Sequence, residues 1–470
     1  MTSEAVVGYV WTQLINHARL FFADSAVKLL QGSSVRFLPY AEAAAARGGQ
    51  IAVPTDVPIP LAPESPWKVP FNSTTLTLWN PMPRPDGDGW QAVPNEAAPV
   101  WYRHASGTLM PSWNLFGNVF DLLTFGEEHR STQRDRHGRF DWTSSLRLEQ
   151  GLLDVPAVNE ATALLVAAAV SVSRSEPPSF VLDSLSGPPV VVLSHDCDIL
   201  TGNDFITQSV RLYRFLQPLA KVRLPRPGNL WWIARNAATP RRFYFDNATG
   251  MVDIERCFGC TSTYYLLNGS GGRFGARSPF SEISRLINRI PPPWEIGIHY
   301  NYHTFLNQDK FAAQLRQLQQ VVPNQIVSGR AHYLRFDPAR SFSFLQQFGI
   351  YVDESSGWPD KVGYRNGIAG CFQAFDPERN SSLDIWEVPM IVMDDALVAQ
   401  YGSDSAQIVA GYLQHLSRIG GALTILFHPG QFLNPEHPGT SGVYHEILKV
   451  CRRAGVVTQT ARSLVDRLRK

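Results

Sequence analysis

The sequence predicts an α/β barrel preceded by a smaller α+β domain, and three observations lead to this expectation. The chain has 470 residues, enough for two or three ordinary domains or for a small domain before one large barrel. Its composition, 44% hydrophobic and 18% charged, is that of a globular protein. From about residue 180, short apolar runs alternate with amphipathic helices, the pattern of parallel strands joined by helical crossovers. We therefore expect an N-terminal domain over residues 1–179 and a barrel domain over residues 180–470.

The N-terminal part has a mixed pattern. Pro and Gly are dense between residues 54 and 89, which indicates short strands joined by loops. Apolar residues at three-to-four spacing predict a helix near residues 115–123, and a second helix is expected over residues 158–172. Pro and Gly clusters on both sides of Phe180 then indicate a domain junction.

Eight apolar runs in the C-terminal part are candidate strands. Helical patterns lie between them, for example Phe311, Leu315, Leu318 and Val322, whose spacing makes one continuous apolar stripe that would pack against a sheet. Eight strands with helices between them indicate a barrel. The expected strands are residues 190–193, 262–267, 295–298, 326–328, 350–352, 385–393, 423–427 and 456–459.

Ionisable residues follow four of these runs at the carboxyl end, where α/β barrels place their active sites. The first run leads into residues 194–198 (SHDCD), which carry two carboxylates two residues apart. The third run leads into His299, and His303 follows four residues later. Arg330 follows the fourth run and His428 follows the seventh. The sequence therefore predicts one polar rim to which four strands contribute.

The residue types of this rim fit a metal-dependent hydrolase. Two histidines at i and i+4 can face one divalent ion, and an aspartate completes a ligand set that leaves positions open for water and substrate. A second aspartate held by an arginine would act as base, and a histidine on the opposite side as acid. Each element alone also has a structural interpretation: a chance H-x-x-x-H, a D-x-D turn or helix cap, and an arginine in an ion pair. Their combination favours the hydrolase.

These motifs, in this order, resemble the polysaccharide deacetylase superfamily, whose members are metal-dependent N- and O-deacetylases with a distorted (β/α) barrel. The SHDCD segment is similar to the first motif of that family, which implies Asp196 as general base and Asp198 as a metal ligand. Residues 295–303 (EIGIHYNYH) match its histidine motif, which implies His299 and His303 as the remaining ligands.

Further matches extend the resemblance. Residues 328–333 (SGRAHY) are similar to the arginine motif of the family, which implies that Arg330 orients the base. Residues 426–429 (LFHP) imply His428 as the general acid that protonates the leaving amine. Asp394 follows an apolar strand, where it would either orient His428 or cap a helix. Other similar segments occur in a bacterial branch tied to surface polysaccharides, in which an uncharacterised domain often precedes the barrel: residues 351–356, 363–367 and 386–389.

The resemblance implies a hydrolase that removes the N-acetyl group of an amino sugar in a glycan or glycan precursor, giving acetate and a free amine. The substrate would be an N-acetylated carbohydrate and the cofactor a divalent metal, Zn first, with Co, Ni and Mn as alternatives. Two other functions stay open. One is an amidohydrolase that cleaves a non-sugar C–N bond with the same metal site, and the other is a glycan-binding protein without catalytic activity.

Charge, hydropathy and cysteine content bear on other classes of function. The 42 Lys and Arg residues balance 41 Asp and Glu residues, and a net charge of +1 provides no basic field for nucleic acid. No apolar stretch reaches the roughly 18–20 residues of a membrane-spanning helix. The first residues do not read as a signal peptide, and five scattered cysteines fit a reducing compartment, so we expect a cytoplasmic protein. The oligomeric state does not follow from the sequence.

Overall fold

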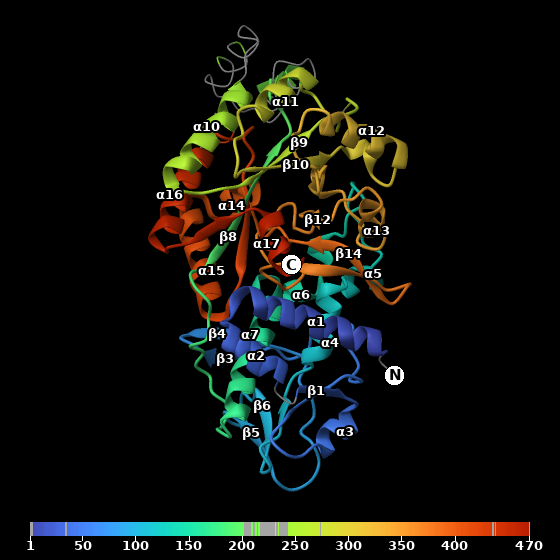
Figure 1. The fold of residues 1–470 in the computed structure, drawn as a ribbon, viewed down its shortest axis with the longest axis vertical. Helices are drawn as coiled ribbons and strands as arrows, with labels where there is room; N and C mark the ends of the chain where they lie inside the picture. Colours follow the sequence, from blue (N-terminus) through green and yellow to red (C-terminus); the bar gives the residue numbers. More distant parts are fainter. Residues whose placement is uncertain are drawn as a thin grey trace.

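The computed structural model describes residues 3–32, 35–201, 243–272, 274–434 and 439–469, with some single positions between 202 and 242 and at 437. It has the mixed α/β class that the sequence predicts. In Figure 1 the N-terminal strands occupy the lower part of the molecule and the large C-terminal sheet the upper part. Helices α1 (Glu4–Phe21) and α7 (Ala157–Ser173) lie between them (Figure 1).

The N-terminal part combines helices with a mixed sheet in the order β1-β2-β7-β6-β5. Strand β2 pairs in parallel with β1 and with β7, whereas β6 pairs antiparallel with both β7 and β5. A separate hairpin is formed by β3 and β4. The strands are β1 (Val35–Leu38), β2 (Ile51–Pro54), β3 (Trp67–Phe71), β4 (Thr74–Leu78), β5 (Trp90–Val93), β6 (Trp101–His104) and β7 (Leu109–Pro111). The remaining helices are α2 (Asp24–Gly32), α3 (Tyr40–Ala45), α4 (Leu115–Leu123), α5 (Gly126–Arg130) and α6 (Leu146–Glu149), with short 3-10 turns η1 (Trp142–Ser144) and η2 (Leu152–Asp154).

The C-terminal part is built on a ten-stranded sheet in the order β13-β14-β12-β11-β10-β9-β8-β16-β15, with β17 beside β8. All its pairs are parallel except β13 with β14, so the carboxyl ends of the parallel strands meet at one edge. Its strands are β8 (Val190–Cys197), β9 (Thr263–Leu267), β10 (Glu295–Tyr300), β11 (Ser328–Ala331), β12 (Val352–Asp353), β13 (Phe372–Asp376), β14 (Ser381–Glu387), β15 (Val392–Met393), β16 (Ala422–Leu426) and β17 (Val457–Gln459).

Helices and short turns join these strands. The helices are α10 (Phe243–Phe258), α11 (Phe280–Ile287), α12 (Gln308–Gln319), α13 (Ser341–Gln346), α14 (Asp394–Tyr401), α15 (Ser405–Ile419), α16 (Thr440–Arg453) and α17 (Ala461–Arg469), and the turns are η3 (Tyr302–Thr304), η4 (His332–Leu334) and η5 (Gly402–Asp404). The apolar stripe that predicted a helix near residue 311 lies in α12, where Phe311 and Leu318 are buried.

Two strand predictions need correction. The expected strand 385–393 is two strands, β14 and β15, because Pro389 between them has no N–H to donate to a ladder. The antiparallel edge strand β13 was not predicted. The pairings among the described residues form an open path from β13 to β15, so closure of the barrel stays a prediction.

One hydrophobic core runs through both parts of the chain. It includes buried residues of α1 and α7 as well as β8, β16 and β14. Polar contacts cross in the same region: the fully buried Asn159 amide of α7 donates to the carbonyls of Ala369 and Gly420 and accepts from the Ala369 N–H. Glu128 and Arg365 form a buried two-bond ion pair, each bond 2.7 Å long. The two parts of the chain therefore share one continuous hydrophobic core. The domain boundary between residues 179 and 180 stays a prediction.

Two general expectations concern the whole chain. No helix within the described residues has the length and apolar character needed to cross a membrane. The five cysteines are free thiols, four of them buried and Cys257 exposed.

Candidate metal centre and catalytic cleft

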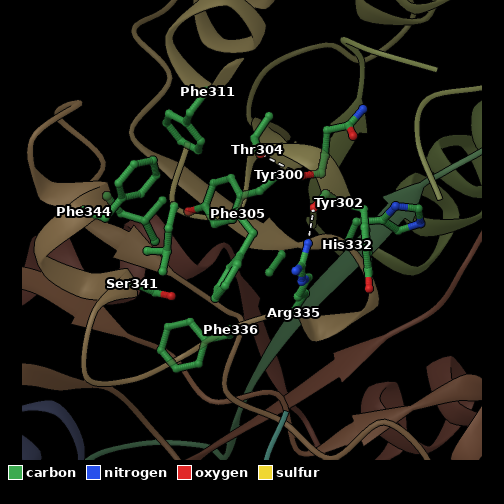
Figure 2. A pocket seen from close by; sticks show the side chains of 14 residues that line it. Tyr300, Tyr302, Thr304, Phe305, Phe311, His332, Arg335, Phe336, Ser341 and Phe344 are labelled. Atoms are coloured by element: carbon green, nitrogen blue, oxygen red, sulfur yellow. Dashed lines mark hydrogen bonds between the residues drawn. The ribbon is translucent and has the colours of Figure 1, made fainter. Parts of the chain in front are cut away.

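A cleft with a volume of about 610 Å³ lies at the carboxyl edge of the parallel strands. It is lined by residues at the ends of β8, β10, β11 and β16, and also by Arg136, His137 and Arg139 of the N-terminal part. A second hollow, shown in Figure 2, lies beside it among Phe305, Phe311, Phe336 and Phe344. That hollow measures only about 30 Å³, which is room for about one water molecule, so the larger cleft is the candidate substrate site.

Three side chains in the cleft form a candidate metal group. Asp198 directly follows β8, His299 lies in β10, and His332 follows β11. Ligand atoms of all three lie within 4.8 Å of one another. Nε2 of His299 is 3.1 Å and Nε2 of His332 is 3.6 Å from Oδ1 of Asp198. One carboxylate oxygen therefore faces two imidazole nitrogens.

The hydrogen bonds around these residues test whether the group suits a metal. Nδ1 of His299 donates to the carbonyl of Arg330 (2.9 Å), and Nδ1 of His332 donates to the carbonyl of Phe274 (3.0 Å). Each neutral ring then presents a lone pair on Nε2, as metal-bound histidines do. Oδ1 of Asp198 is buried, and no hydrogen bond of normal geometry from the described residues reaches it. Two nitrogens and one carboxylate oxygen suit Zn²⁺ or a similar divalent ion with open positions.

The electrostatics of the three side chains bear on that donor set. Burial lowers the pKa of His332 to about 4, so this ring is neutral at pH 7. Burial also acts to lower the pKa of His299, but Asp196 and Asp198 outweigh it and the pKa is raised. Burial acts to raise the pKa of Asp198, yet the histidines hold it far below its ordinary value. The carboxylate is therefore ionised and available as a ligand.

His303, the third ligand expected from the sequence, lies outside this group, and His332 stands in its place. An i, i+4 pair shares one face only on a helix, whereas here β10 continues to Tyr300 and the three-residue turn η3 follows. The side chain of His303 lies against Gly272, since its Nε2 would be 3.4 Å from a Cβ built there. His332 reaches the site because β11 pairs in parallel with β10, with Arg330 opposite His299.

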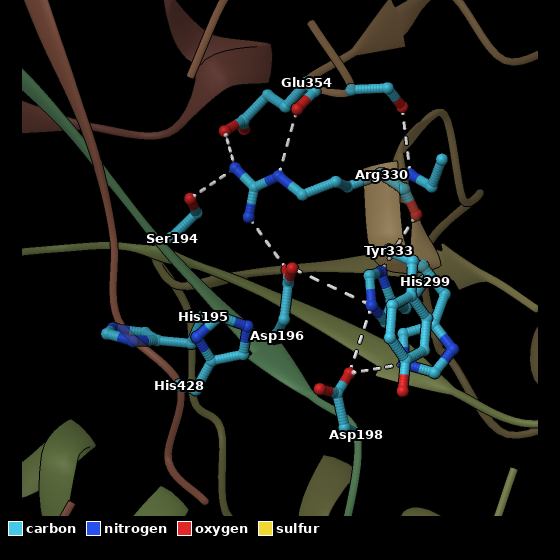
Figure 3. A network of polar contacts seen from close by, with 12 residues as sticks. Ser194, His195, Asp196, Asp198, His299, Arg330, Tyr333, Glu354 and His428 are labelled. Carbon is cyan, nitrogen blue, oxygen red and sulfur yellow. Dashed lines mark hydrogen bonds and ion pairs between the residues drawn. The ribbon is translucent and has the colours of Figure 1, made fainter. Parts of the chain in front are cut away.

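The expected base is held by a buried arginine. Arg330 donates from Nη1 to Oδ1 of Asp196 (2.8 Å), from Nη2 to the hydroxyl of Ser194 (2.7 Å), and from Nη2 to the carboxylate of Glu354. Figure 3 shows the guanidinium lying between these three side chains. Burial acts to raise the pKa of Asp196, but Arg330, His299 and His428 hold it below its ordinary value. Asp196 is therefore an ionised carboxylate, and its hydrogen bond with Arg330 fixes its orientation.

The expected acid is held by a buried carboxylate. Asp394, at the start of α14, accepts from the backbone N–H of His428 (2.7 Å) and lies 2.8 Å from its Nδ1. In Figure 3 His428 lies on the other side of Asp196 from His299. Burial alone would lower the pKa of His428, but Asp394, together with Asp198 and Asp196, raises it well above the ordinary value. His428 is therefore a proton donor at neutral pH.

Several supporting residues were not predicted from the sequence. Glu354 follows β12 and accepts a hydrogen bond from the Arg330 guanidinium. It also accepts a hydrogen bond from the Tyr265 hydroxyl (2.5 Å). Burial raises the pKa of Glu354 to about 7 against the opposing effect of Arg330. Its position directly after a predicted strand was the available signal, and the same signal applied to His332. No local pattern predicts that Arg136, His137 and Arg139 lie at the cleft, because they reach it from a distant part of the chain.

Comparisons with known proteins give limited likeness. Residues 82–171 match a family of unknown function, DUF7033. A search of curated proteins finds no match. Among solved structures, a candidate polysaccharide deacetylase from Mycobacterium smegmatis is similar at 16% identity and TM-score 0.39, over 60% of this chain and 91% of its own. A chitin deacetylase from Colletotrichum lindemuthianum is similar at 12% identity and TM-score 0.33, over 59% and 88%. At such distances the likeness decides neither activity nor family membership, and the functional argument rests on the site.

Proposed function

We propose that this protein is a metal-dependent hydrolase that removes the N-acetyl group of an amino sugar in a glycan or glycan precursor. One observation carries the proposal. A single cleft holds a two-histidine, one-aspartate donor group, an aspartate clamped by a buried arginine, and a histidine clamped by a buried aspartate. The order of these residues along the chain also resembles the polysaccharide deacetylase superfamily.

Asp198, His299 and His332 would hold the divalent ion, with Zn²⁺ as the first candidate and Co, Ni or Mn as alternatives. When bound, the ion supplies a Lewis acid for the acetyl carbonyl and the attacking water. Arg330 keeps Asp196 ionised and aimed into the cleft, so this carboxylate accepts the proton of the water.

His428 completes the reaction on the opposite side. Its pKa is raised by Asp394, so the ring holds a proton that it gives to the leaving nitrogen. The water oxygen bonds to the acetyl carbon, the C–N bond breaks, and the products are acetate and a free amine. Glu354 holds Arg330, which holds Asp196, and Asp394 holds His428, so the geometry of both catalytic side chains stays in place through the reaction.

The substrate class fits an aromatic side chain at the cleft. Tyr333 is 36% exposed, has a left-handed backbone with φ of 60°, and has its ring centroid 4.5 Å from that of His332. An exposed aromatic face beside a metal group suits the apolar face of a sugar ring. A cytoplasmic location, expected from the sequence, is part of this proposal.

The test is acetate release from N-acetylated oligosaccharides by the purified full chain, before and after removal of metal with a chelator. We expect release that stops on chelation and returns with Zn²⁺. Asp196→Asn should keep the metal and lose at least about 100-fold in kcat, the scale of general-base catalysis. Asp253→Asn is the matched control, because Asp253 is 72% exposed and lies outside the cleft. Acetate release that is unaffected by chelation, or by Asp196→Asn, would contradict the proposal.

A further inference from the structure

A short loop of the N-terminal part forms one wall of the catalytic cleft. Three residues that lie far before β8 in the sequence line the cleft: Arg136, His137 and Arg139. Nη1 of Arg139 donates to the carbonyl of Tyr333 (2.6 Å), and Nδ1 of His137 is 3.2 Å from the hydroxyl of Tyr302. The loop is thus attached to the residues that follow β10 and β11. It belongs to the segment that matches DUF7033.

The loop is also fixed internally. Oδ1 of Asp135 accepts from the N–H groups of His137 (2.8 Å) and Arg139 (3.0 Å), while its Oδ2 pairs with the Arg139 guanidinium. Gly138 has φ of 79°, which lets the chain turn tightly between Arg134 and Phe140, the two residues of an isolated antiparallel bridge. Phe140 is buried against Trp358 at its end. The side chains that it presents to the cleft are therefore held in place before substrate arrives.

Arg136 differs from the other arginine of the loop. Arg139 is neutralised by Asp135, whereas no carboxylate of the described residues lies within 4.0 Å of the Arg136 guanidinium. Its Nε donates to Nε2 of His137 (3.2 Å), which can accept because burial and the charge of Arg139 lower the pKa of that ring. This bond fixes the orientation of Arg136. Its two terminal nitrogens have no protein partner within the described chain and form an open, charged fork at the cleft wall.

We propose that Arg136 binds an anionic group of the substrate, a carboxylate or a phosphate carried next to the N-acetylated sugar. The proposal rests on the deacetylase function and adds its substrate class, an acidic carbohydrate. A guanidinium with one edge held by the protein and the other open is suited to two parallel hydrogen bonds with a carboxylate or phosphate. Arg136 is then a specificity-determining residue, and the N-terminal part supplies it to the active site.

The test compares three N-acetylglucosamine probes on the full metal-loaded chain: neutral chitotetraose, a tetrasaccharide alternating with glucuronate, and N-acetylglucosamine 1-phosphate. We expect Arg136→Ala to raise KM for an anionic probe by about 10- to 100-fold and to leave KM for chitotetraose within about twofold, because only the anion meets the fork. Arg136→Lys should recover part of the affinity, since it keeps the charge but not the paired geometry. Which anionic probe responds identifies the carboxylate or the phosphate.

The control is Arg379→Ala, because Arg379 is 74% exposed and lies outside the cleft. Metal content and circular dichroism of each variant show that it is folded. Calorimetric binding of the same probes separates the two proposals: if no probe is hydrolysed but Arg136→Ala still weakens anionic binding selectively, the subsite stands and the deacetylase function fails. Equal effects of Arg136→Ala on neutral and anionic probes, or no effect on either, would overturn the subsite.

Discussion

Replacing His332 with Ala should release the metal, whereas replacing His303 with Ala should leave it bound. Nε2 of His332 faces the same oxygen of Asp198 as Nε2 of His299, at 3.6 and 3.1 Å. His303 lies in η3 against Gly272. Loss of an outer partner of a metal-bound imidazole already weakens binding by about 10- to 100-fold, so loss of the imidazole itself should cost at least about 100-fold, or about 2.7 kcal/mol.

Unfolding gives a second measure of the same change. With free Zn²⁺ at about 100 times the wild-type Kd, binding stabilises the folded chain by about 2.7 kcal/mol. An affinity about 100-fold lower leaves only about 0.4 kcal/mol of this gain at the same Zn²⁺ concentration. His332→Ala should therefore lose most of the metal-dependent stabilisation, and His303→Ala should keep it.

The assay is competition of each purified variant with a chromophoric Zn²⁺ chelator, followed by urea unfolding with and without Zn²⁺. The absorption spectrum of the Co²⁺-loaded chain reports the ligand set, and it should change in His332→Ala alone. Metal retained by His332→Ala and lost by His303→Ala would refute the geometric argument and restore the ligand set inferred from the sequence. Equal retention by both variants would place the metal elsewhere.

Three further predictions follow from buried polar groups. Asp394→Asn removes the charge that outweighs burial at His428, so the alkaline limb of the kcat profile should move to lower pH by at least about one unit. Burial, together with the neighbouring carboxyl group of Asp353, raises the pKa of Glu387 well above its ordinary value. The folded chain therefore keeps a proton that the unfolded chain loses, and the free energy of unfolding falls as the pH rises above about 4.5. Glu387→Gln should flatten that fall in urea unfolding between pH 4.5 and 8. Asn159→Ala should cost at least about 2 kcal/mol in urea unfolding, because it leaves the buried Gly420 carbonyl and the Ala369 N–H without partners, while the Ala369 carbonyl keeps the Ala422 N–H.

Each of these has a distinct contrary outcome. An unchanged alkaline limb in Asp394→Asn would mean that His428 does not titrate in the measured step. A fall in stability with pH that persists in Glu387→Gln would assign it to another buried acid, such as Glu354. A loss below about 0.5 kcal/mol in Asn159→Ala, the range of surface substitutions, would mean that water replaces its hydrogen bonds.

The positions of Asp198, His299, Arg330 and His428 at or next to the cleft could be predicted because each follows an apolar run of the sequence. Parallel strands bring their carboxyl ends to one edge, so residues far apart in sequence become neighbours without any knowledge of strand order. His332 satisfies the same rule, whereas the i, i+4 spacing of His299 and His303 predicts His303 as the ligand. That spacing has meaning only on a helix, and the chain there is a strand followed by a turn.

Contacts between the two parts of the chain could not be predicted. Glu128 and Arg365 are both buried, a state that a charged residue reaches only when a partner meets it. Neither residue stands in a periodic pattern that marks it as buried. The same holds for Arg136, whose importance arises from a loop that packs on Tyr302 and Tyr333 more than 160 residues away in sequence. Such contacts are determined by tertiary packing and not by any local rule.

The buried carboxylate of Glu255 helps to hold the segment that carries the acid His428. Glu255 accepts hydrogen bonds from the side chains of Ser262, Trp294 and Tyr444. Its Oε1 also lies 2.5 Å from Nε2 of His195, whose Nδ1 is 2.8 Å from the carbonyl oxygen of Phe427. The strand that carries the base is therefore tied to the residue directly before the acid His428. Neither this link nor the Arg330 clamp on Asp196 uses a metal ligand, so base and acid are positioned by the protein alone. It follows that removing the metal should abolish activity while leaving the fold and the two catalytic side chains in place, which readdition of Zn²⁺ would reveal as full and rapid recovery.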